Sequence, residues 1–221
     1  MDLKSLLARV DHTLLDICAT QSDFFAICID GLEYGVASVC VPPSAVRLCA
    51  GYLEGKLPVC TVVGFPNGYG SSEVKAFEAE DAIKHGAAEI DMVINLGHVK
   101  DKKFSEVLAD IRAVREVTEK KILKVIIETV KLSHEEKIKL CEIVSESGAD
   151  FIKTSTGFAG GGATFEDVSL LSKHVAPSVQ VKAAGGINSL EDAYRFVELG
   201  ASRLGTSRII KLVKGLDVSG Y

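Results

Sequence analysis

Two lysines and an aspartate stand at the ends of apolar runs, where they could carry out carbonyl chemistry. Lys153 ends the run FIK and leads into the loop TSTG, so its ammonium passes from the core to a loop mouth. Burial disfavours the charged form of an amine, and a neutral lysine attacks carbonyl carbons. A lone lysine here would be read as a side chain that reaches solvent from a strand end. However, Lys182 holds the same place in VQVKAAGGI and Asp91 ends a run in GAAEIDMVIN, so the three together favour a site.

Alternation along the predicted strands turns these polar side chains toward one interior. Successive side chains of a strand point to opposite faces, so Lys182 lies opposite its neighbouring valines. Buried charges must be paired, and the grouped acids and amines could pair with one another. A purely structural network of ion pairs is the competing explanation. The same parity groups Phe151, Lys153 and Ser155, then Glu89 and Asp91, then Lys124, Ile126 and Glu128.

Short β-branched runs recur along the chain and predict the frame that positions these residues. They cover residues 10–13, 37–41, 59–64, 89–95, 123–129, 150–154, 179–183 and 203–206. Segments with helical periodicity lie between them, most clearly Phe104, Val107, Leu108, Ile111 and Val114. Ser/Thr-x-x-Asp/Glu capping patterns mark helix starts at Thr20 with Asp23, Ser133 with Glu136, Thr164 with Asp167 and Ser189 with Asp192.

Alternating strands and helices favour right-handed βαβ units and a parallel sheet. Eight such units predict an α/β fold: one (β/α)8 TIM-barrel domain over residues 1–221, with a short N-terminal helix and a C-terminal tail. An open doubly wound sheet is the alternative, but no GxGxxG motif follows the first run.

The composition argues against several classes of function. A chain of 221 residues with 47% hydrophobic and 25% charged residues fits a globular protein. Its net charge of −5 argues against nucleic-acid and anionic-membrane partners. No apolar run is long enough for a signal peptide or a membrane span, so we expect a cytoplasmic protein. Six cysteines scattered through apolar segments are expected to be buried free thiols, and the histidines lack ligand spacing, so no metal site is predicted.

Glycine-rich turns after the seventh and eighth runs predict a phosphate site. KAAGGIN and RLGTSR each lead into a helix, and barrel enzymes commonly hold phosphate at these two loops with backbone N–H groups. Gly185, Gly186, Gly205 and Ser207 would supply the donors. We interpret GGGA at residues 160–163 as an active-site loop, whereas VGFPNGYGSSE fits an active-site loop and a plain connection equally well.

Together these motifs resemble the class I 2-deoxyribose-5-phosphate aldolase family over nearly the whole chain. The matching segments, in order, are VDHTLL, SVCVPP, VVGFPNG, AEIDMVIN, LKVIIET, FIKTSTGF, VKAAGGI and LGTSR. The resemblance implies an imine-forming lyase that uses no metal or other cofactor. Such an enzyme cleaves 2-deoxy-D-ribose 5-phosphate to D-glyceraldehyde 3-phosphate and acetaldehyde in deoxyribonucleotide catabolism. A homodimer is also implied.

The same resemblance implies the roles of individual residues. Lys153 matches the Schiff-base lysine and Asp91 the acid of the proton relay. Lys182 matches the partner lysine, a proton donor or acceptor that would lower the pKa of the reactive amine by like-charge repulsion. Residues near the substrate correspond to Asp11, Thr13, Cys40, Lys124 and Thr156, and Gly157 joins the phosphate donors.

The sequence departs from the family pattern in several places. Phe158 follows STG where some relatives carry lysine, and GTSR stands where a second serine is common, so we expect Arg208 to supply part of the phosphate-binding charge. Asp16 replaces a Lys-Pro pair of many relatives, without a catalytic implication. Tyr221 is open to two interpretations: a frayed end, or a residue that folds over the mouth and assists proton transfer to the enamine.

Two other classes of function fit the same residues. One is another phosphosugar barrel enzyme, such as a different imine-forming aldolase or a transaldolase, since fold and chemistry are shared. The other is a barrel that binds or regulates without turnover. The set of Lys153, Lys182 and Asp91 weighs against the second class.

Overall fold

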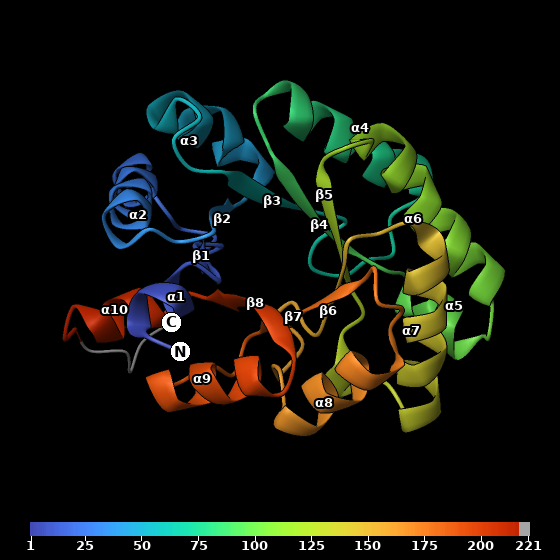
Figure 1. The fold of residues 1–221 in the computed structure, drawn as a ribbon. Helices are drawn as coiled ribbons and strands as arrows, with labels where there is room; N and C mark the ends of the chain where they lie inside the picture. The colour runs from blue at the N-terminus through green and yellow to red at the C-terminus, as the bar shows by residue number, and fades with distance from the viewer. Residues whose placement is uncertain (217–221) are drawn as a thin grey trace.

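Parallel strands close into a barrel in sequence order, and the eighth strand pairs with the first (Figure 1). The computed structural model describes residues 1–216. Since β1 pairs with both β2 and β8, the closed barrel is confirmed and the open doubly wound sheet is wrong. The strands are β1 (Val10–Thr13), β2 (Ser38–Val41), β3 (Val59–Val63), β4 (Glu89–Val93), β5 (Ile122–Ile126), β6 (Phe151–Lys153), β7 (Gln180–Ala184) and β8 (Ala201–Thr206).

Helices surround the barrel on the outside (Figure 1). In the described residues none of them has the length and apolar character needed to cross a membrane. The α-helices are α1 (Leu3–Leu7), α2 (Gln21–Tyr34), α3 (Val46–Leu53), α4 (Ser72–Lys84), α5 (Leu96–Lys100), α6 (Phe104–Thr118), α7 (His134–Ser147), α8 (Phe165–His174), α9 (Leu190–Glu198) and α10 (Ile209–Val213), with 3₁₀ turns η1 (Pro43–Ala45) and η2 (Thr129–Lys131).

Side-chain caps fix the helix starts, and all four predicted starts are confirmed. At α9, Ser189 accepts a hydrogen bond from the N–H of Asp192 at 3.0 Å. The carboxylate of Asp192 in turn accepts the N–H of Asn188 at 3.0 Å, which ties the loop after β7 to the first turn of the helix. The other three starts are capped by Thr20, Ser133 and Thr164.

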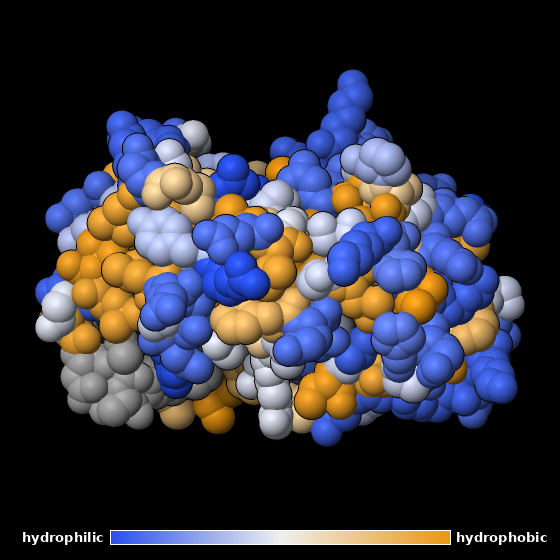
Figure 2. All heavy atoms as spheres, turned by 60° about the horizontal axis from the view of Figure 1, so that its bottom comes forward, coloured by the Kyte–Doolittle hydropathy of each residue, from blue (hydrophilic) through white to orange (hydrophobic). Residues whose placement is uncertain are grey.

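Strand alternation divides the apolar side chains between two layers. Val39, Val59, Ile90 and Ile152 face outward and join the main core between barrel and helices. Each such buried side chain contributes about 1.5–3 kcal/mol to folding. A smaller apolar cluster of Leu15, Cys40, Cys60 and Val62 is separate from that core. On the outside, hydrophilic side chains cover much of the face in Figure 2, and hydrophobic ones show between them.

Candidate active site

Three lysines from neighbouring strands converge on the carboxylate of Asp91. The Lys153 and Lys182 ammonium groups each donate to Asp91 Oδ2 at 2.7 Å, and Lys124 donates to Oδ1 at 2.8 Å. The side chains of Lys124, Lys182 and Asp91 are fully buried, and that of Lys153 is 5% exposed. The predicted grouping of Lys153, Lys182 and Asp91 inside the barrel is confirmed.

The strand register explains why these side chains meet. Lys153 on β6 lies directly beside Lys182 on β7, and Asp91 on β4 lies beside Lys124 on β5. Paired residues of adjacent parallel strands point to the same side of the sheet. The interior of this barrel is therefore polar at this level, where branched apolar side chains are the usual filling.

A second layer of ion pairs lies next to the first. Lys182 contacts Asp11 Oδ2 at 2.5 Å, and Lys124 contacts Glu89 Oε2 at 2.6 Å. Arg203 from β8 binds both acids, with Nη1 2.5 Å from Asp11 Oδ1 and two bonds of 3.1 Å to Glu89. The sequence analysis missed Arg203 as an interior residue, although its position opposite Leu204, which joins the main core, was an available signal.

The charges of this network are fixed by its contacts. Burial alone would raise the pKa of Asp91, but Lys124, Lys153 and Lys182 hold it well below the usual range. Burial would lower the pKa of Lys182, yet Asp11 and Asp91 raise it above the ordinary lysine value. The pKa of Asp11 is likewise lowered despite burial, by Lys182 first. Lys182 is therefore a cation beside Lys153 at neutral pH, as the sequence analysis assumed.

Lys124 holds its charge for the same reason. Burial would lower the pKa of Lys124, but Asp91 and its other anionic neighbours raise it well above the usual value. Lys124 and Lys182 each contact at least two carboxylates, whereas the described ion pairs of Lys153 involve Asp91 only. Lys153 thus has the fewest anionic partners of the three amines.

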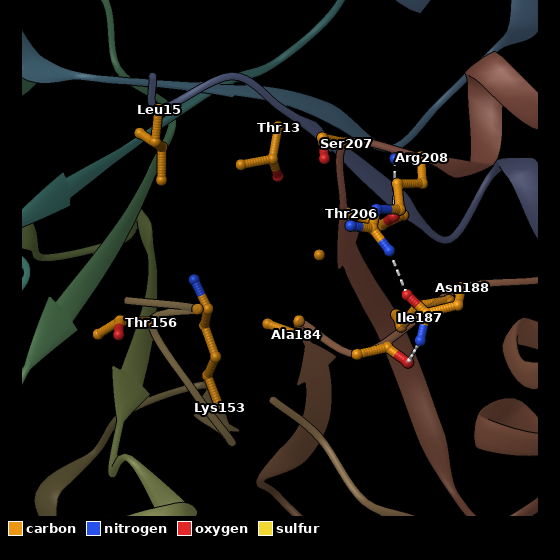
Figure 3. A pocket seen from close by; sticks show the side chains of 14 residues that line it. Thr13, Leu15, Lys153, Thr156, Ala184, Ile187, Asn188, Thr206, Ser207 and Arg208 are labelled. Carbon is orange, nitrogen blue, oxygen red and sulfur yellow. Dashed lines mark hydrogen bonds between the residues drawn. The ribbon is translucent and has the colours of Figure 1, made fainter. Parts of the chain in front are cut away.

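The Lys153 amine opens into a cavity of about 250 Å³ (Figure 3). Figure 3 shows its nitrogen pointing into this space, with Leu15 and Thr13 on one side and Arg208 and Asn188 across it. All six predicted phosphate-binding residues line the cavity. The lining comprises Thr13, Leu15, Lys153, Thr156, Gly157, Ala184, Gly185, Gly186, Ile187, Asn188, Gly205, Thr206, Ser207 and Arg208.

The predicted substrate-binding residues fall into two groups. Thr13 and Thr156 line the cavity together with Lys153. Asp11, Cys40 and Lys124 are not among the lining residues and are fully buried. Two of them reach the site through ion pairs: Asp11 contacts Lys182, and Lys124 contacts Asp91.

Glycines let the loops after β6 and β7 approach each other closely. Gly185 and Gly186 have left-handed backbones, with φ of 70° and 72°. A Cβ at Gly162 would lie 2.4 Å from the carbonyl carbon of Gly185, so only glycine fits there. The GGGA loop thus packs behind the cavity wall instead of lining it. The N–H of Gly185 already donates to the carbonyl of Gly205 at 3.3 Å and would have to be shared with a bound anion.

Arg208 is held at the cavity rim by Asn188 from the loop after β7 and by Thr206 at the end of β8. Its guanidinium donates to Asn188 Oδ1, and its backbone N–H donates to Thr206 Oγ1 at 3.0 Å. Asn188 Nδ2 donates to the carbonyl of Gly186 at 3.2 Å (Figure 3). The sequence analysis missed Asn188, and its place directly before the α9 cap was the available signal.

Glu128 has a different position from the one expected. We predicted that it shares a strand face with Lys124, but this is wrong because β5 ends at Ile126 and Glu128 has a left-handed backbone with φ of 55°. Its buried carboxylate accepts the Thr156 hydroxyl at 2.5 Å and the Thr156 N–H at 3.2 Å. Thr156 Oγ1 also accepts the N–H of Phe158 at 3.0 Å. Glu128 therefore fixes the loop that follows Lys153.

The loop after β3 contributes an aromatic contact instead of cavity lining. Phe65 packs against the small apolar cluster and meets Phe158 edge-on, with ring centroids 5.3 Å apart. This contact joins the loops after β3 and β6. Tyr221, whose role was left open, lies outside the described residues 1–216.

The thiols and acids of the interior offer no clear cation site. Cys40, Cys60 and Asp91 come within 4.8 Å of one another, as do Asp11, Cys60 and Glu89. Each of these carboxylates already binds lysine or arginine, which occupy the positions a metal ion would need. All six cysteines are free, as predicted, but Cys18 is exposed where burial was expected.

Comparisons with known proteins agree with this geometry. A sequence model described as DeoC/LacD family aldolase matches residues 5–210. A deoxyribose-phosphate aldolase of Streptococcus agalactiae serotype Ia is 56% identical over 218 residues, 99% of this chain and 98% of that protein.

Solved structures give the same result. A putative deoxyribose-phosphate aldolase from Coccidioides immitis aligns with a TM-score of 0.92 and 41% identity, covering 97% of this chain and 87% of that one. A deoxyribose phosphate aldolase from Aeropyrum pernix, described as tetrameric, aligns with a TM-score of 0.89 and 30% identity, covering 96% and 92% of the two chains.

Proposed function

The chain belongs to the DeoC/LacD aldolase family, and we propose that it is the aldehyde-lyase that reversibly cleaves 2-deoxy-D-ribose 5-phosphate to D-glyceraldehyde 3-phosphate and acetaldehyde through an imine. One observation carries the proposal. The Lys153 amine opens into the cavity while it contacts Asp91, which also binds the cation of Lys182. A reactive amine, a proton carrier and a fixed cation are thus in contact.

Lys153 acts as the nucleophile. As a neutral amine it adds to the aldehyde carbon of the open-chain sugar and forms a carbinolamine. Lys182 donates a hydrogen bond to Asp91 at 2.7 Å, and these two residues pass protons as water leaves and the iminium forms. The cationic Lys182 favours the neutral form of its neighbour by like-charge repulsion.

The iminium then drives carbon–carbon cleavage. Deprotonation of the third-carbon hydroxyl breaks the bond between the second and third carbons, and the bonding electrons move toward the iminium nitrogen. D-Glyceraldehyde 3-phosphate leaves, and an enamine remains on Lys153. Protonation of the enamine carbon and hydrolysis of the resulting imine release acetaldehyde and restore the amine.

The far wall of the cavity suits the phosphate end of the substrate. Gly186, Gly205 and Ser207 bring backbone and hydroxyl donors to the loops after β7 and β8, and Arg208 adds a full positive charge at the rim. Lys153 lies on the opposite side of the same cavity (Figure 3). The substrate would therefore span the cavity, with its aldehyde at Lys153 and its phosphate at Arg208.

Trapping with acetaldehyde and borohydride, followed by mass mapping, tests the proposal. We expect a reduced label at Lys153 in the parent protein and none in Lys153→Arg. No label in the folded parent protein would refute an imine mechanism and favour a barrel that binds without turnover. Transfer of dihydroxyacetone instead of acetaldehyde would favour the transaldolase class.

Other features of the proposal follow from the same chemistry. The iminium withdraws the electrons that a Lewis acid would otherwise withdraw, so we propose that no metal or other cofactor is required. Dialysis against EDTA should leave the cleavage rate unchanged. A homodimer and a cytoplasmic location stay predictions.

A further inference from the structure

We propose that Arg203 is a positioning residue for this reaction. It binds Asp11 and Glu89 from the far end of the barrel, and its charge gives the network of ion pairs four basic groups for three acids. The inference rests on the proposed function, because it explains how the Lys153 amine becomes neutral. Arg203 does not line the cavity into which the Lys153 amine opens, so it would act through the two acids that it binds.

Arg203 closes the end of the barrel opposite the catalytic cavity. It lines a separate cavity of about 510 Å³ with Phe151, Gln180 and Ile122, which are the first residues of their strands. Its guanidinium lies 5.6 Å from the centroid of the Phe151 ring, and its side chain is 12% exposed. The charge is thus held inside the barrel and is weakly screened by solvent.

An irregularity in β8 turns Arg203 inward. Val181 pairs with Ala201, but Lys182 pairs with Arg203, so Ser202 is an extra residue between them. Without this bulge Ser202 would stand beside Lys182 and Arg203 would face the helices. The bulge therefore places a guanidinium on the strand beside Lys182, where alternation counted from Ala201 would have placed a serine.

Every strand contributes a titratable group to the interior around Lys153. Asp11 on β1 and Glu89 and Asp91 on β4 are the acids. The bases are Lys124, Lys153, Lys182 and Arg203 on β5 to β8, and the thiols of Cys40 and Cys60 complete the ring from β2 and β3. Four bases thus share three carboxylates in one set of ion pairs. Two further charged groups lie at the cavity outside this set: the buried carboxylate of Glu128, which binds Thr156, and Arg208 at the rim, which binds Asn188.

The excess base is Lys153. Arg203 is bound by Asp11 and Glu89, Lys182 by Asp11 and Asp91, and Lys124 by Glu89 and Asp91. Lys153 has one carboxylate oxygen, and it shares this oxygen with Lys182. When Lys153 loses its proton the network becomes neutral. If Arg203 were uncharged, the network would be neutral with Lys153 protonated, and the amine would hold its proton more firmly.

The pH dependence of kcat/KM for cleavage of 2-deoxyribose 5-phosphate tests this inference. In Arg203→Met we expect the acidic limb to move to higher pH by about one unit. This is the effect of a unit charge two strands away, or about 10 Å, at an effective dielectric constant of about 20. Arg203→Lys keeps the charge and should restore the limb. Arg112→Met, which removes an exposed arginine paired with Glu146 on the outer surface, is the matched control and should leave it unmoved.

Glu89→Gln should shift the acidic limb in the opposite direction. It also tests the inference if Arg203→Met does not fold. It removes an acid from the network, so the acidic limb should move to lower pH. An unmoved limb in a folded Arg203→Met or Glu89→Gln variant overturns the inference, and a loss of thermal stability alone would mark Arg203 as purely structural. If the parent protein also gave no borohydride label at Lys153, the proposed function itself would have failed.

Discussion

Replacing Asp91 by asparagine removes the carboxylate that three ammonium groups share. Lys124, Lys153 and Lys182 would then face a neutral amide in a fully buried site. Removing one partner of a buried ion pair costs about 3–5 kcal/mol of folding free energy, because a buried charge loses its compensation. Loss of a positioned proton carrier lowers kcat by about 10²- to 10⁴-fold. We therefore expect Asp91→Asn to lose both stability and activity.

The pH dependence of the stability loss follows from the lowered pKa of Asp91. In the unfolded chain an aspartate titrates near pH 4, so the carboxylate contributes its full stabilisation above about that value. The contribution is lost only as the pH falls through the lower folded-state value. The difference in unfolding free energy between parent and variant should therefore be constant from about pH 5 to about pH 8 and shrink in strong acid.

Asp110→Asn is the matched control that separates stability from catalysis. Asp110 forms a buried ion pair with lysine outside the barrel, between α4 and α6, with its carboxylate 2.6 Å from the Lys75 ammonium. Urea denaturation should show a comparable loss of stability in both variants, while the coupled assay for acetaldehyde release should show lost turnover only in Asp91→Asn. The reasoning fails if folded Asp91→Asn retains more than about a tenth of the parent kcat.

The remaining predictions concern the rim, the loop after β6 and the helix side of β1. Arg208→Ser should raise KM for the phosphorylated substrate about tenfold and leave cleavage of unphosphorylated deoxyribose unchanged, and an unchanged KM contradicts the rim assignment. Glu128→Gln should lower the unfolding free energy in urea by about 1.5–3 kcal/mol, because two bonds from Thr156 lose a charged acceptor. Burial lowers the pKa of His12 to about 4, so the parent should lose about 3 kcal/mol between pH 7 and pH 4 that His12→Asn does not lose.

Periodicity and caps were sufficient to predict the frame. The run at residues 10–13 coincides with β1, and the other strands differ from their predicted runs by a few residues at their ends. The runs at 89–95 and 123–129 were predicted too long, because apolar or β-branched residues continue into the loops after β4 and β5. Propensity alone does not separate such a loop from a strand end, whereas hydrogen bonding to the neighbouring strand does.

The interior was only partly predictable. Lys153, Lys182, Lys124 and Asp91 obey simple alternation, so their convergence could be inferred from parity. The direction of Arg203 could also be inferred, from its place before Leu204, but its position beside Lys182 could not, because this depends on an extra residue in β8. Such bulges depend on how two neighbouring strands pack and leave no clear mark in a single sequence.

The end of each strand distinguishes Lys153, the proposed reactive amine, from the other two buried lysines. Lys124 lies in the middle of β5 and Lys182 in the middle of β7, where each binds two carboxylates and has a raised pKa. Strand β6 has three residues and ends at Lys153, so its side chain is at the mouth and meets only Asp91. The loop that begins directly after Lys153 is held by the bonds from Thr156 to Glu128, and it lines the cavity through Thr156, so we expect it to leave the Lys153 amine able to meet a carbonyl group.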